Sequence, residues 1–99
     1  MFSKRNIDRN MIAVFCHRHQ IKRLSLFGSI LTDQFDDSSD IDVLVEFEDD
    51  AKVSLFDVGG MMHELTQQFG QQVDIRTPDD LSRYFRDDVV SKAEMIYAA

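Results

Sequence analysis

An apolar run headed by two aspartates at alternate positions constrains the fold of this chain more than any other feature. Asp40 and Asp42 flank Ile41 at the head of the run. A short run rich in β-branched side chains predicts a buried strand over 41–47. Successive side chains of a strand point to opposite faces, so the two aspartates share one face, about 6.6 Å apart along the backbone. Ile41 and Val43 would then point into the core.

Helical and strand patterns alternate along the rest of the chain. Apolar side chains recur at helical spacing in some segments, and shorter apolar runs end at glycine or at polar residues in others. This alternation predicts a small α/β domain with helices packed on a sheet. In chain order, the predicted elements are a helix over 5–20, a strand over 24–27, one or two helical turns within 29–35, the strand over 41–47, a helix from the N-cap Ser54 to Gly70, a strand over 72–76, and a C-terminal helical part that starts at Thr77-Pro78 and includes Phe85, Val89, Ala93 and Ile96.

Two glycines interrupt the helix predicted between Ser54 and Gly70. Gly59 and Gly60 should each cost about 1 kcal/mol relative to alanine in a helix interior. A close contact with another backbone at this point would offset that cost.

Size and composition limit the classes of protein to consider. The 99 residues are enough for one domain over 1–99 but not for a second core. The formal net charge of −7 opposes phosphate backbones, so we expect no direct nucleic-acid binding and favour a cation or a basic protein as partner. One cysteine, Cys16, excludes an internal disulfide and is expected to be a buried thiol. Without a signal-peptide pattern or a run of roughly 20 apolar residues, a cytoplasmic protein with no membrane span is expected.

Three acids and a Gly-Ser pair are candidates for binding a metal ion and a phosphate. Asp40 and Asp42 repel each other unless a cation lies between them, and Mg²⁺ commonly binds one or two carboxylates together with substrate phosphates. Asp74 lies in another predicted strand between apolar neighbours, so its side chain can join the pair. Gly28-Ser29 follows a predicted strand, where glycine permits close approach of the backbone to a phosphate. Together they describe a metal-assisted phosphoryl or nucleotidyl transfer site; a turn-and-cap arrangement is the alternative for the aspartates.

The spacing of these residues resembles the nucleotidyltransferase superfamily related to DNA polymerase β. Gly28-Ser29, ten residues and then Asp40-Ile41-Asp42 match its signature without a gap, and Asp74 matches its third acid. The resemblance implies an α/β (α+β) fold with a small mixed β-sheet flanked by helices. The short length and the stretch VDIRTPDDLSRYFRDDVVSKAEMIYA further resemble the minimal nucleotidyltransferases, the antitoxins of HEPN/MNT toxin–antitoxin pairs.

This resemblance implies an activity, a cofactor and a partner. The implied activity is transfer of AMP from ATP to a tyrosine of a HEPN ribonuclease toxin, which silences the toxin. Asp40, Asp42 and Asp74 would be catalytic and would bind Mg²⁺ or Mn²⁺. Gly28 and Ser29 would bind the nucleotide.

One departure from the family pattern keeps two alternatives open. Family members commonly read Gly-Ser-x-Ala-Arg-Gly at the phosphate cradle, whereas this chain has Thr32 and Asp33 at the last two positions. A cation is lost and a negative charge is added, which favours a binding-only antitoxin that occludes its toxin. A transferase acting on a small molecule such as an aminoglycoside is the other alternative, although 99 residues leave little room for its substrate-binding parts.

Overall fold

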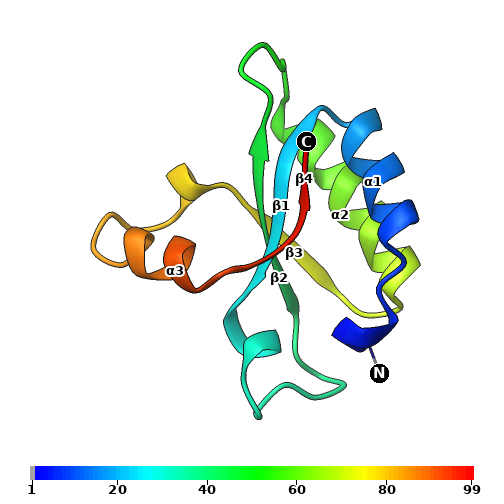
Figure 1. Ribbon diagram of the computed structural model, residues 1–99, viewed down its shortest axis with the longest axis vertical. Coiled ribbons are helices and arrows are strands. Elements are labelled where there is room, and N and C mark those ends of the chain that lie inside the picture. The colour runs from blue at the N-terminus through cyan, green and yellow to red at the C-terminus, as the bar shows by residue number, and fades with distance from the viewer. Residues whose placement is uncertain (1) are drawn as a thin grey trace.

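Two antiparallel strands, β1 (Ile21–Phe27) and β2 (Ile41–Phe47), form the centre of the sheet in the computed structural model, which describes residues 2–99 (Figure 1). β3 (Val73–Arg76) pairs in parallel with β2, and β4 (Glu94–Ala98) pairs antiparallel with β1. The strand order is therefore β3-β2-β1-β4. This confirms the predicted mixed sheet flanked by helices.

One face of the sheet is covered by α1 (Arg9–Arg18) and α2 (Leu55–Phe69), which lie together on the same side in Figure 1. Ile41 and Val43 point into the core on this face and are fully buried, as the alternation along β2 predicts. The parallel partner strand contributes Val73 and Ile75 beside them. The core also contains Ile12, Phe15, Cys16, Leu24, Leu26, Val45, Met61 and Leu65.

Side-chain caps decide where the two long helices begin. The helix predicted over 5–20 starts later, at Arg9, because the Asp8 carboxylate accepts hydrogen bonds from the backbone N–H groups of Asn10 and Met11. A separate 3₁₀ turn, η1 (Lys4–Asn6), precedes it. The N-cap of α2 is Ser54, as predicted, and it forms a reciprocal capping box with Asp57.

The C-terminal part differs from the sequence prediction. The helix expected from Thr77 is a single 3₁₀ turn, η3 (Pro78–Asp80), and only α3 (Arg86–Lys92) is α-helical. The backbone becomes extended at Ala93, and Ile96 lies in β4 with its side chain buried. The prediction of Ile96 in a helix was wrong because pairing with the free edge of β1 satisfies the backbone there.

Two shorter elements also change. β1 begins at Ile21, three residues before the predicted Leu24, and the side chain of Ile21 is buried. The helical turns expected within 29–35 reduce to one 3₁₀ turn, η2 (Gly28–Leu31). None of the helices in residues 2–99 is long and apolar enough to cross a membrane.

The two glycines inside α2 yield a stability prediction, since a Cβ atom added to Gly59 or Gly60 would meet no atom within 4 Å. No close contact offsets their cost, so Gly59→Ala and Gly60→Ala should each stabilise the protein by about 0.5–1 kcal/mol in urea unfolding. Gly70→Ala is the matched control: it should destabilise, because Gly70 closes the helix with φ of 71°. Destabilisation by either helical substitution would contradict the structure of α2.

Candidate active site

The strand register places two of the three predicted acids side by side. Asp42 of β2 and Asp74 of β3 are directly paired in the parallel ladder, where neighbouring strands lie about 4.8 Å apart. Because their neighbours Ile41 and Val73 point into the core, both carboxylates lie on the sheet face away from α1 and α2. Asp42 and Asp74 are half-buried, whereas Asp40 precedes the strand and is exposed.

The Gly-Ser turn lies directly against this acidic pair. Phe27, the last residue of β1, is paired with Asp42, so the chain enters η2 beside that carboxylate. Gly28 has φ of 77°, and a Cβ atom added to it would lie 2.3 Å from Asp42 Oδ2. Only glycine fits both the backbone angle and the close approach. The structure thus brings Gly28, Ser29 and the acids to one edge of the sheet.

Hydrogen bonds close the turn and hold the loop that leads to Asp40. The backbone N–H and the hydroxyl of Thr32 both donate to the carbonyl oxygen of Ser29, each at 2.9 Å. Further along, the side chain of Gln71 donates to the carbonyl oxygens of Asp36 and Ser39 at 2.9 and 2.7 Å. These bonds tie the loop before β2 to the segment before β3, so the acids of the two strands are supported together.

Asp74 has a positively charged partner, Arg76, whereas Asp42 is hydrogen-bonded to no cation in the structure of residues 2–99. Burial, followed by repulsion from Asp74 and Asp40, raises the pKa of Asp42, while Arg76 acts in the opposite direction. Arg76 Nε donates to Asp74 Oδ2 at 3.1 Å. Arg76 was not among the site residues expected from the sequence, although a position two residues after Asp74 on a strand places both side chains on the same face.

The arrangement suits a metal shared with a substrate better than a protein-only metal centre. Within residues 2–99, no three His, Cys, Asp or Glu side chains are gathered closely enough to enclose a metal ion. Mg²⁺ usually takes one or two carboxylates and completes its shell with water and substrate phosphates. Asp42 and Asp74 repel each other, and Arg76 neutralises only part of their charge. The pair therefore suits this way of binding Mg²⁺.

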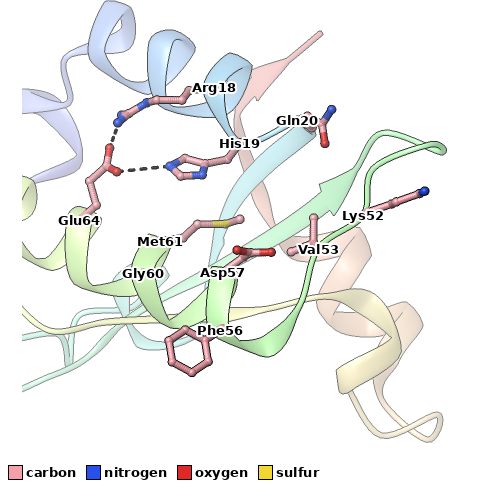
Figure 2. Close-up of a pocket in the computed structure, with 10 residues that line it drawn as sticks. All are labelled: Arg18, His19, Gln20, Lys52, Val53, Phe56, Asp57, Gly60, Met61 and Glu64. Atoms are coloured by element: carbon pink, nitrogen blue, oxygen red, sulfur yellow. Dashed lines mark hydrogen bonds and ion pairs between the residues drawn. The ribbon is translucent and has the colours of Figure 1, made fainter.

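A hollow of about 440 Å³ lies elsewhere, between the end of α1 and the start of α2 (Figure 2). In Figure 2, Glu64 lies between Arg18 and His19 and contacts both side chains. The distance from His19 Nε2 to Glu64 Oε1 is 3.3 Å. None of the predicted site residues lines this hollow. The ion pair between Arg18 and Glu64 joins α1 to α2, and the acids of the sheet remain the candidate active site.

Residues 9–96 match the family model described as the nucleotidyltransferase domain. The chain belongs to this family. "Putative protein adenylyltransferase MJ0435" of Methanocaldococcus jannaschii is 33% identical to it over 87 residues, which are 88% of this chain and 90% of that protein. A solved "putative minimal nucleotidyltransferase" is 30% identical, with a TM-score of 0.71 over 86% of this chain and 85% of its own.

Chains in solved structures of toxin–antitoxin complexes share the fold of this nucleotidyltransferase domain. A crystal structure of a toxin–antitoxin with AMP-PNP has a TM-score of 0.74 at 19% identity and covers 94% of this chain and 75% of its own. A rebuilt structure of tri-AMPylated Shewanella oneidensis HEPN toxin in complex with MNT antitoxin has a TM-score of 0.65 at 19% identity, covering 92% and 70%. At these identities the likeness is one of fold.

The contact between Gly28 and Asp42 can be tested by stability. Gly28→Ala should lower the free energy of unfolding by about 2–3 kcal/mol, because it adds a clash to the backbone strain of a positive φ. Gly70→Ala has nearly the same φ and open space around it, so it should cost only about 1–2 kcal/mol. Combining each with Asp42→Ala, which removes the clashing oxygen, should make the two costs equal in urea unfolding. A persistent difference would contradict the contact.

The raised pKa of Asp42 gives a pH dependence. Folding disfavours its ionised form, so Asp42→Asn should raise the free energy of unfolding at pH 7, by roughly 0.2–1 kcal/mol for a partly exposed, screened group. The penalty is present above the folded-state pKa and disappears as the pH falls through it towards the ordinary value. The advantage of the variant should therefore shrink between pH 7 and acidic pH in urea titrations.

Asp36 supplies the opposite control for this pH experiment. Hydrogen bonds from the side chain and backbone of Ser38 and from Ser39 lower the pKa of Asp36. Asp36→Asn should therefore destabilise the protein at pH 7, and its deficit should shrink as the pH falls through the lowered pKa. Equal pH profiles for the two variants would refute the assigned electrostatics.

Proposed function

We propose that this nucleotidyltransferase domain is an antitoxin that transfers AMP from ATP to a tyrosine of a HEPN-domain toxin. The observation that carries the proposal is the pairing of Asp42 with Asp74 beside the Gly28 turn. The relative named as a protein adenylyltransferase supports a protein as acceptor. The fold shared with antitoxins in complex with HEPN toxin supports the partner.

Each acid has a role in this proposal. Asp40, Asp42 and Asp74 would hold Mg²⁺ or Mn²⁺ jointly with the phosphate oxygens of ATP, and charge stabilisation at the transferring phosphate is the chemistry that the bound metal supplies. The backbone at Gly28 and the side chain of Ser29 would bind the phosphates.

The proposed transfer is a displacement of pyrophosphate by the tyrosine oxygen. The tyrosine oxygen forms a bond to the α-phosphorus of ATP while the bond to pyrophosphate breaks, and pyrophosphate leaves. Asp74 would accept the proton of the tyrosine hydroxyl as general base. Its hydrogen bond from Arg76 orients the carboxylate for this role.

A second candidate function is neutralisation by binding alone. Thr32 and Asp33 replace the arginine and glycine that the family's cradle commonly carries. The hydroxyl of Thr32 is also used inside the turn, in its bond to the carbonyl of Ser29. An acidic antitoxin with a weakened cradle would still occlude a basic toxin surface by charge complementarity.

The two functions separate when toxin modification and protection of cells are measured together. The cognate toxin is co-expressed with wild-type protein or with Asp42→Ala, then weighed by intact mass spectrometry while growth is scored. We expect additions of the mass of AMP on a toxin tyrosine with the wild type, almost complete loss of them with the variant, and restored toxicity. Protection by the variant together with an unmodified toxin would establish binding alone.

Asp49→Ala is the matched control for loss of an acid. Its side chain is fully exposed, and its Oδ1 lies 3.7 Å from Lys22 Nζ. This variant should modify the toxin as the wild type does. Circular dichroism of both variants should show an unchanged fold, which assigns the loss in Asp42→Ala to the site.

A further inference from the structure

A hollow of about 650 Å³ opens beside the Gly-Ser turn, between the end of β1 and helix α3. Its walls are mostly apolar. They include residues far apart in the sequence, since η2 and α3 are separated by more than half of the chain. The lining includes Phe27, Gly28 and Thr32 on one side and Asp88, Val89 and Lys92 on the other.

Gly28 makes this hollow continuous with the acidic pair. The same glycine lines the hollow and lies so close to Asp42 that an added Cβ would be 2.3 Å from its carboxylate oxygen. A nucleotide whose phosphates contact Gly28 therefore has the hollow on one side and the acids on the other. A charged side chain that lines the hollow would then be within electrostatic reach of those phosphates.

The hollow contains a cation that can move. Of the described residues that line it, Lys92 is the one with a positive charge, and Lys92 Nζ lies 3.1 Å from Asp88 Oδ1. Both side chains are more than half exposed, at 72% and 61%. An exposed ion pair one helical turn apart contributes little to stability, so a competing anion breaks it at low cost.

Two other side-chain donors near the turn, those of Thr32 and Arg76, are already hydrogen-bonded. Thr32 donates its hydroxyl to the carbonyl of Ser29, inside the turn. Arg76 pairs with Asp74 and does not line the hollow. Among the described residues, none on the η2 side of the hollow is a cation, although a chain of net charge −7 needs positive charge to hold a polyphosphate.

We propose that Lys92 binds the phosphates of the nucleotide and supplies the charge that Thr32, in the place of the family's usual arginine, does not. Asp88 is its partner in the absence of nucleotide, and the lysine turns from Asp88 to the phosphates when ATP binds. Lysine suits this role as a flexible point charge that binds phosphate without a fixed geometry. The inference rests on the proposed function, since it takes ATP as the ligand.

Titration calorimetry with the full chain tests the assignment. Lys92→Met should weaken binding of Mg²⁺–ATP about tenfold, the lower end expected for a charge-assisted hydrogen bond at an exposed site. The loss should be smaller for AMP than for ATP, because AMP has fewer phosphates. Lys92→Arg should restore most of the affinity. Lys22→Met is the control: Lys22 is a half-buried lysine of β1 whose ammonium lies 3.7 Å from Asp49, and its loss should leave binding as in the wild type.

Asp88 provides a second, independent measurement. Asp88→Asn frees Lys92 and should tighten ATP binding severalfold in the wild type, with a smaller gain in the Lys92→Met background. Wild-type affinity in Lys92→Met, or an equal loss for ATP and AMP, would overturn the role of Lys92 and leave the proposed function intact. A wild-type chain that binds no Mg²⁺–ATP would instead overturn the proposed function.

Discussion

The close approach of Gly28 to the carboxylate of Asp42 is the contact on which the candidate active site depends. It exists because Phe27 is paired with Asp42 in the antiparallel ladder and because glycine tolerates the positive φ that follows. A slip of one residue between β1 and β2 would turn Asp42 into the core and expose Val43. Burial of Val43 and its neighbours therefore both stabilises the sheet and fixes the face on which Asp42 lies.

Repulsion between the acids of the candidate site opposes folding. Asp42 and Asp74 lie side by side and are both half-buried, and Arg76 balances only part of their charge. Such a pair lowers stability unless a cation joins it. The apolar face under α1 and α2 offsets this cost, so one side of the sheet stabilises the fold while the other gathers the acids.

The differences from the common family pattern lie in the turn proposed to bind phosphates and not in the acids. All three acids and the Gly-Ser pair are present, while Thr32 and Asp33 alter the turn that follows them. The fold brings Lys92 to the same hollow from the other end of the chain. In the role proposed for Lys92, a cation missing at position 32 is supplied by a residue that the tertiary structure brings to the same hollow.

The sequence by itself determined the local features. Alternation along 41–47 assigned Asp42 to one face and Val43 to the other, the Ser54 capping box started α2, and the Gly-Ser spacing led to the family. Only the tertiary structure decided which distant residues meet: Asp74 lies beside Asp42, Arg76 pairs with Asp74, Lys92 and Thr32 line the same hollow, and Ile96 lies in a fourth strand. The hydrophobic pattern of a segment reflects its own helical or strand periodicity, so it can be read locally. Strand pairing also depends on a free strand edge, and that edge belongs to a distant part of the chain.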